Sequence, residues 1–149
     1  MLLLRIRRLC ILRLTEEKNR LWEDHTMARV LALDDESTIL VVLSALLKAD
    51  GHEVVTLAGG NEAVEAIETQ EFDLLISDVR MDPIDGFQFL KLAKKVHPEM
   101  PVIMITAYYS LEKAKEMTRM GAFACLKKPF DLPQLQDVVG RAVNKTESK

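Results

Sequence analysis

The chain has 149 residues, which is enough for one compact domain and too few for two of ordinary size. Its 48% hydrophobic and 29% charged residues match the composition of an ordinary soluble protein. Six of the 20 basic residues and four of the 23 acidic residues lie in residues 1–26, so the rest of the chain carries a formal charge of −5. An acidic body argues against nucleic acid as a direct ligand.

The first fourteen residues are apolar apart from the arginines at positions 5, 7, 8 and 13. These charges interrupt the run too often for a spanning helix or a signal-peptide core, and they spread around a helical wheel. We therefore expect residues 1–27 to be an N-terminal extension, disordered or partly helical, without membrane association; an anchoring or dimerising role is the weaker alternative. Cys10 and Cys125 lie in dissimilar contexts, so we expect no mutual disulfide and a cytoplasmic protein.

From Arg29 onward, short apolar runs alternate with segments of helical periodicity. The apolar runs predict strands near residues 29–33, 53–57, 73–77, 101–106 and 122–126. Helices are expected around residues 39–47, 63–67, 85–96, 110–119 and 131–144. Repeated strand–helix order with fully apolar strands predicts an α/β domain with a parallel sheet buried on both faces and right-handed crossovers. We place this domain at residues 28–145, followed by a polar tail at 146–149.

Polar side chains stand where the predicted strands end. Asp34 and Asp35 follow the first strand, Asp78 follows the third, Thr106 closes the fourth and Lys128 lies just past the fifth. Ligands of open parallel sheets bind beyond the carboxyl ends of the strands, so we expect these five residues to meet there. Three converging carboxylates repel one another, and a cation must offset that repulsion.

This residue set suits phosphoryl chemistry with a divalent cation. Mg²⁺ prefers hard oxygen ligands and keeps several waters, so Asp35 and Asp78 could bind it directly and Asp34 through water. Asp78 would then be ionised and able to attack a phosphoryl group, forming an acyl phosphate. Lys128 offers a point charge and Thr106 a hydroxyl for the phosphoryl oxygens.

Each of these residues also has a simpler interpretation. An Asp-Asp pair after a strand often caps a helix, and Asp35-Glu36-Ser37 could do so here. A threonine that ends a strand is usually structural, and a lysine before proline is usually a solvated loop residue. The functional interpretation is favoured because a single strand order brings all five residues into one pocket.

Residues 28–145 resemble a response-regulator receiver domain of two-component signalling, of the stand-alone, chemotaxis-regulator-like kind. The matching motifs are Leu33-Asp34-Asp35-Glu36, Asp78-Val79-Arg80-Met81 with Asp85-Gly86, Ile105-Thr106-Ala107, Gly121-Ala122 and Lys128-Pro129-Phe130. The resemblance implies a doubly wound, flavodoxin-like (βα)5 fold with strand order 2-1-3-4-5.

The resemblance also implies a role for each site residue. Asp78 would be the phosphoacceptor, and Asp35, Asp78 and the Arg80 carbonyl would bind Mg²⁺, with Asp34 acting through water. Thr106 and Lys128 would contact the phosphoryl group, and Lys128-Pro129 would be a cis peptide.

The implied function is that of a signalling module and not of an enzyme, apart from self-phosphorylation and slow self-dephosphorylation. A sensor histidine kinase or a phosphotransfer protein would donate the phosphoryl group, and a downstream effector protein would bind the switched face. No direct contact with nucleic acid or membrane is expected. Only 19 residues follow Phe130, so we expect no output domain in this chain.

Two features depart from the family pattern. Receivers usually have Met-Pro-Gly after the phosphoacceptor, whereas this chain has Met81-Asp82-Pro83-Ile84. The fifth-strand position that holds a switching Tyr or Phe in receivers is Cys125 here. Tyr108, and Phe123 on the same side of the fifth strand, are the nearest aromatic candidates for a substitute.

Three other functions fit part of the pattern. A flavodoxin-like FMN carrier would share the topology, but Asp34-Asp35-Glu36 would repel its phosphate. A Mg²⁺-dependent phosphohydrolase would need a second acid/base carboxylate where Arg80 stands. A non-phosphorylated receiver that serves only as a binding module is the third alternative, although every acidic residue of the site is present.

Overall fold

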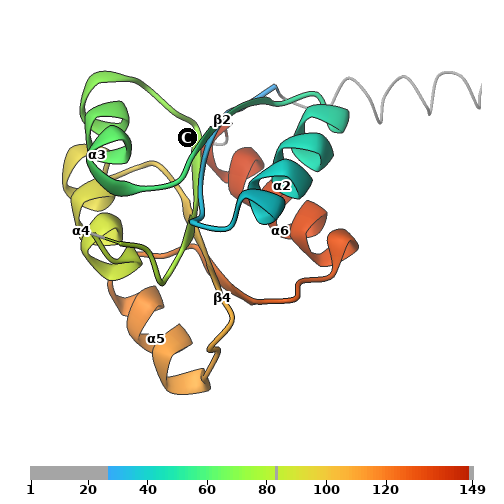
Figure 1. Cartoon of the computed structure of the whole chain (residues 1–149). Coiled ribbons are helices and arrows are strands. Elements are labelled where there is room, and N and C mark those ends of the chain that lie inside the picture. The colour runs from blue at the N-terminus through green and yellow to red at the C-terminus, as the bar shows by residue number, and fades with distance from the viewer. Residues whose placement is uncertain (1–26, 83, 148–149) are drawn as a thin grey trace, which may run out of the picture.

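The computed structural model describes residues 27–82 and 84–147, and within them five parallel strands alternate with five helices (Figure 1). The strands are β1 (Arg29–Leu33), β2 (Glu53–Leu57), β3 (Leu74–Asp78), β4 (Val102–Thr106) and β5 (Ala124–Lys127). The helices are α2 (Ser37–Ala49), α3 (Gly60–Thr69), α4 (Gly86–Val96), α5 (Leu111–Arg119) and α6 (Leu132–Glu147). The sheet order is β2-β1-β3-β4-β5, which confirms the predicted doubly wound topology. Most of the expected N-terminal extension, including Cys10, lies outside the described residues.

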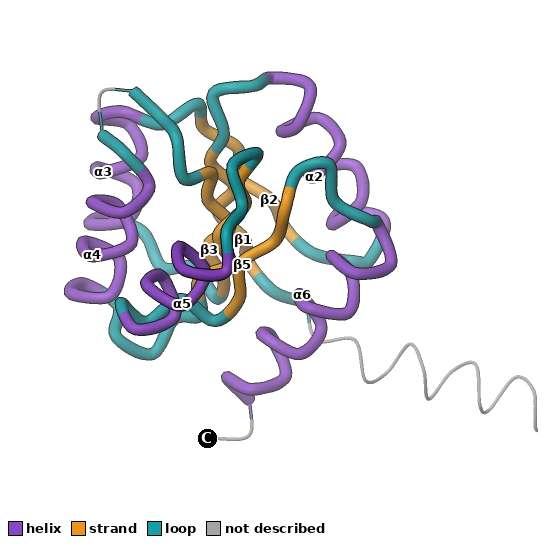
Figure 2. Tube along the Cα trace, turned by 90° about the horizontal axis from the view of Figure 1, so that it is seen from below, coloured by secondary structure: helices purple, strands orange, loops and turns teal. Residues whose placement is uncertain are grey.

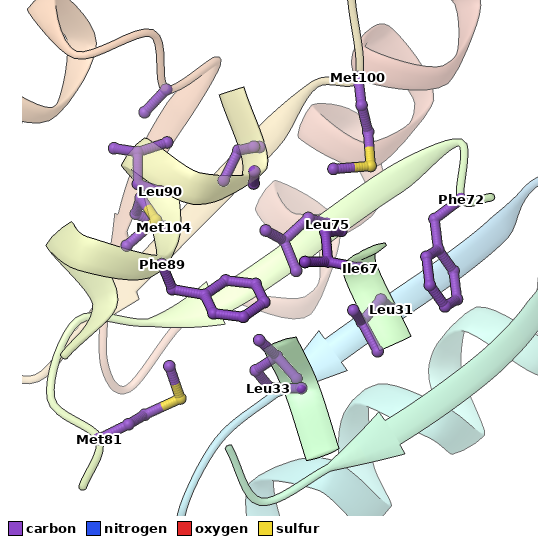
Figure 3. Close-up of a cluster of buried hydrophobic side chains, with 14 of the residues drawn as sticks. Leu31, Leu33, Ile67, Phe72, Leu75, Met81, Phe89, Leu90, Met100 and Met104 are labelled. Atoms are coloured by element: carbon purple, nitrogen blue, oxygen red, sulfur yellow. The ribbon is translucent and has the colours of Figure 1, made fainter. Parts of the chain in front are cut away.

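Helices cover both faces of the sheet, α2 and α6 on one side and α3, α4 and α5 on the other (Figure 2). Alternate side chains of each strand point to opposite faces, so Leu31 and Leu33 pack under α3 and α4 while Val30 and Ala32 pack under α2 and α6. Figure 3 shows the first of these cores, in which Phe89 of α4 lies among aliphatic side chains of the sheet and of α3. Burial on both faces explains why the central strands β1, β3 and β4 are mostly apolar, whereas the edge strand β2 has Glu53 and Thr56 exposed.

Helix boundaries follow local signals in the sequence. Gly51 follows the end of α2 and has a φ of 90°, a conformation that glycine adopts without steric cost. Asp85 and Gln88 form a reciprocal capping box at the start of α4, and the helix ends before His97-Pro98 as predicted. The simpler interpretation of Asp35-Glu36-Ser37 as a helix cap is not supported by α2, because Glu36 is its N-cap residue and makes no side-chain cap hydrogen bond.

Three strands differ in their limits from the sequence-based prediction: β3 and β5 lie further toward the C-terminus, and β4 begins one residue later, at Val102. The third strand runs from Leu74 to Asp78, and Asp73 precedes it. The Asp73 backbone N–H donates to the Arg29 carbonyl at 2.8 Å, and its carboxylate accepts a hydrogen bond from the Arg29 backbone N–H at 2.8 Å. The fifth strand begins at Ala124, so Phe123 precedes it and does not follow its alternation. Phe123 packs on the α2–α6 side and Cys125 on the α3–α5 side, so the prediction that they share a side is wrong.

The strand register brings the polar strand ends together. Leu33 of β1 is paired with Ser77 of β3, so Asp34 and Asp78 come next on adjacent strands. Asp78 is paired with Ile105 of β4, and Thr106 is paired with Lys127 of β5. Four of the five strands therefore deliver a site residue to the same edge of the sheet. Within the described part of the chain, no helix combines the length and apolarity needed to cross a membrane.

Candidate metal centre

Three carboxylates converge at the carboxyl ends of β1 and β3. Asp34 and Asp78 are buried, whereas Asp35 is exposed to solvent. One carboxylate oxygen from each of the three lies within 4.8 Å of the others. The predicted convergence is therefore present.

Lys128 is the cation that pairs with this cluster. Its Nζ lies 2.6 Å from Asp34 Oδ2, 3.2 Å from Asp78 Oδ2 and 3.4 Å from Glu36 Oε1. The loop that carries it is fixed to β4 by a hydrogen bond from the Lys128 N–H to the Thr106 carbonyl at 2.7 Å. The Lys128–Pro129 peptide bond is cis, which confirms that expectation.

Burial and pairing act in opposite directions on the titration of these groups. Burial raises the pKa of Asp34, and the nearby Asp78 adds to this, while Lys128 and the Glu36 backbone N–H oppose it. Burial alone would lower the pKa of Lys128, but its pairing with Asp34 and Asp78 prevails and raises that pKa. The ammonium group is therefore charged at neutral pH.

Thr106 lies at the end of β4 with its side chain buried. Its Oγ1 accepts a hydrogen bond from the Tyr108 backbone N–H at 3.0 Å. The Arg80 backbone N–H lies 3.4 Å from Asp78 Oδ1, a long contact that places the start of the next loop beside the carboxylate. The five residues predicted to meet beyond the strand ends therefore lie at one edge of the sheet.

Two contacts at this pocket were not predicted from the sequence. The Arg80 guanidinium carbon lies 3.8 Å above the centre of the Tyr108 ring, a cation–π geometry that joins the loops after β3 and β4. The second contact is the ion pair between Glu36 and Lys128. A weak signal for the stack existed, since Arg80 and Tyr108 each stand two residues after a predicted site residue.

The loop after Asp78 is held by a close backbone approach at Gly86. A Cβ atom at this position would lie 2.3 Å from the Asp78 carbonyl oxygen and 2.6 Å from Val79 Cα, so only glycine fits without displacement. The Gly86 N–H donates to the Val79 carbonyl at 2.8 Å. Of the unusual residues in this loop, Met81 is buried and Asp82 is exposed, while Pro83 lies outside the described residues.

The donor set fits a hard divalent cation. Three carboxylates face one ammonium group, which leaves uncompensated negative charge, and carboxylate oxygens are the ligands that Mg²⁺ prefers. The exposed Asp35 leaves one side of the cluster open to solvent, as a cation that retains coordinated waters requires.

Comparison with known proteins agrees with this geometry. A family model for the response regulator receiver domain matches residues 30–140. The chain belongs to this family. It is a phosphoacceptor signalling module of two-component systems, and its family generally binds Mg²⁺ in an acidic pocket. The two alternatives, a phosphohydrolase and a non-phosphorylated binding module, are not favoured by these matches.

Relatives of this receiver include longer regulators and isolated receiver domains. Transcriptional regulatory protein ZraR of Escherichia coli is 38% identical over 124 residues, covering 83% of this chain and 28% of ZraR. NtrC of Klebsiella pneumoniae is 40% identical over 112 residues, covering 75% of this chain and 24% of NtrC. A receiver domain protein from Clostridium thermocellum has a TM-score of 0.75 and 34% identity, covering 81% of this chain and 98% of that one. The receiver thus spans about a quarter of the length of these curated relatives.

Proposed function

We propose that Asp78 is the residue that accepts the phosphoryl group. The observation that carries this proposal is the position of its carboxylate, which belongs to the three-carboxylate cluster and also lies 3.2 Å from Lys128 Nζ. Asp34 makes the shorter contact with Lys128 but is almost fully buried, so Asp78 is the better-placed nucleophile for an incoming donor.

Phosphoryl transfer forms one bond and breaks one. An oxygen of the ionised Asp78 attacks phosphorus, and the bond to the imidazole nitrogen of the donor's phosphohistidine breaks, leaving the electron pair on that nitrogen. Lys128 and the Thr106 hydroxyl contact the phosphoryl oxygens, which carry the developing charge. A bound Mg²⁺, held by Asp35, Asp78 and the Arg80 carbonyl with Asp34 acting through water, would neutralise part of that charge.

We propose a sensor histidine kinase or a phosphotransfer protein as the donor and an effector protein as the recipient of the signal. The acidic body gives no basis for direct binding to nucleic acid. We do not propose that the protein turns over a separate substrate. Three expectations stay predictions: the stand-alone organisation, the domain limits 28–145 and the cytoplasmic location.

Intact mass spectrometry tests the assignment of Asp78. Wild-type protein incubated with acetyl phosphate and Mg²⁺ should gain the mass of one phosphoryl group, which hydroxylamine should remove because acyl phosphates react with it. Asp78→Asn and chelation of Mg²⁺ should each abolish the gain. Asp82→Asn is the matched control, since it removes an exposed carboxylate from the same loop without touching the cluster.

Equal phosphate on the wild type and on Asp78→Asn would refute the assignment. A wild type that takes up no phosphate from acetyl phosphate or from any purified kinase would favour the non-phosphorylated binding module instead.

A further inference from the structure

Lys128 has a third carboxylate partner besides the two aspartates. An ammonium group has three N–H donors, and three carboxylates lie within 3.4 Å of Lys128 Nζ. The Glu36 side chain is 58% exposed, whereas that of Asp34 is 1% exposed and that of Asp78 is 8% exposed. Glu36 is therefore the outer partner, on the solvent side of the ammonium group.

Helix capping does not explain this glutamate. Glu36 occupies the N-cap of α2, where Ser, Thr, Asp and Asn are preferred because their short side chains reach the free N–H groups. Its side chain makes no cap hydrogen bond and lies instead against Lys128, 92 residues away in the sequence. Its backbone N–H is bound by Asp34 Oδ1 at 2.9 Å, which fixes where the side chain begins.

We infer that Glu36 is a positioning residue for phosphoryl transfer, one that holds Lys128 between reactions and competes with the phosphoryl group for its ammonium group. The inference rests on the proposed function of Asp78 and Lys128. When Asp78 carries a phosphoryl group, Lys128 needs a free N–H for a phosphoryl oxygen. Glu36 makes the longest of the three contacts and is the most exposed, so its ion pair with Lys128 is the one that breaks when the phosphoryl group binds.

Removing the charge of Glu36 should speed phosphorylation and weaken the binding of Mg²⁺. Glu36→Gln frees Lys128 and reduces the repulsion of an anionic donor, so phosphorylation by acetyl phosphate should become about 3- to 10-fold faster. The same change removes an attractive charge from the surroundings of a divalent cation, so the Kd for Mg²⁺ should rise about 2- to 5-fold. Both effects should shrink as ionic strength rises, because the pair is partly exposed.

The experiment compares wild type, Glu36→Gln and the control Glu68→Gln in the full chain. Glu68 is an exposed residue near the end of α3, so its substitution removes the same charge without reaching Lys128. Phosphorylation rates are measured by intact mass at saturating Mg²⁺, and Mg²⁺ affinity by isothermal titration calorimetry without donor. Faster phosphorylation together with weaker Mg²⁺ binding in Glu36→Gln alone is the expected result.

A purely structural role for Glu36 would impair both properties or leave both unchanged, and either result would overturn the inference. Equal acceleration in Glu68→Gln would also overturn it, because the effect would then come from net charge. A wild type that takes up no phosphate would overturn the proposed function and this inference together, whereas a reactive wild type with an unchanged Glu36→Gln overturns this inference alone.

Discussion

Replacing Lys128 by methionine should destabilise the fold, because it leaves buried carboxylates without their cation. Methionine retains most of the aliphatic volume, so the change removes the charge and little packing. Asp34 loses the ammonium group that lies 2.6 Å from its carboxylate, and Asp78 loses the same group at 3.2 Å. Asp34, Asp35 and Asp78 then repel one another without compensation.

The size of the effect follows from burial. Removing one member of a fully buried ion pair costs about 3–5 kcal/mol, and the cost is lower here because the pocket opens at the sheet edge beside the exposed Asp35 and Glu36. We expect a loss of about 2–3 kcal/mol in the free energy of unfolding at neutral pH without Mg²⁺. For a chain of this size, each kcal/mol lowers the Tm by about 2–4 °C.

The loss should depend on pH in a defined direction. Burial already raises the pKa of Asp34, and without Lys128, which opposes that shift, the pKa rises further. A carboxyl whose pKa is higher in the folded state than in the unfolded state favours folding while protonated and loses that contribution as the pH rises through its folded-state value. The penalty of Lys128→Met should therefore be largest at neutral pH and shrink as the pH falls from neutral into the acidic range.

Urea unfolding of both proteins across this pH range, with and without Mg²⁺, measures the effect. Mg²⁺ should restore part of the lost stability, because it binds the folded carboxylate cluster. Lys127→Met is the control, since Lys127 is the exposed last residue of β5 and has no ion pair with the cluster among the described contacts. A loss below about 1 kcal/mol, or a loss that grows on acidification, would refute the electrostatic reasoning.

Three further predictions follow from other parts of the structure. Gly86→Ala should lower the free energy of unfolding by about 1–3 kcal/mol and slow phosphorylation, because the new Cβ would displace the backbone of Asp78 and Val79. Urea unfolding and intact mass spectrometry measure the two effects, and a variant that behaves like the wild type in both would contradict this prediction. Tyr108→Ala should reduce the gain in partner affinity that phosphorylation produces, measured by calorimetry, whereas an unchanged gain would exclude Tyr108 from the switch. A chain that starts at Met27 should keep its phosphorylation rate, and a loss of stability above about 2 kcal/mol or a change from dimer to monomer would show residues 1–26 to be structural.

The positions of the main site residues were predictable because they depend on strand ends alone. Once the apolar runs are accepted as parallel strands, Asp34, Asp78 and Lys128 must come to one edge, whatever their side chains do. The Glu36–Lys128 ion pair and the Arg80–Tyr108 stack were not predictable in this way. They depend on side-chain direction across loops, which no periodicity in the sequence encodes.

The smaller errors have the same origin. Apolar periodicity locates the centre of a strand well, but its end is decided by which hydrogen bonds compete there. Asp73 looked like the first residue of a strand, and its backbone N–H does donate to the Arg29 carbonyl. Its carboxylate also accepts a hydrogen bond from the Arg29 backbone N–H, and the strand begins only at Leu74. Phe123 looked like a strand residue two positions before Cys125, but the strand begins only at Ala124 and the two side chains pack on opposite faces.

Cys125 bears on how this receiver can transmit a signal. Its side chain packs against the α3–α5 core, and burial raises the pKa of its thiol, so a small neutral group stands where the family resemblance implies an aromatic ring. It cannot exchange a large buried surface for an exposed one. Signal transmission must then use other groups attached to the site.

The loop after β4 contains such a group. Thr106 accepts the Tyr108 N–H, so a rotation of its hydroxyl toward a phosphoryl group on Asp78 would break that hydrogen bond. The Tyr108 side chain is 57% exposed, and its ring stacks against the guanidinium group of Arg80, which follows Asp78 by two residues. Phosphorylation of Asp78 would therefore act on both ends of this contact. We expect the segment from Tyr108 to Leu111, which is exposed throughout, to change position as a unit.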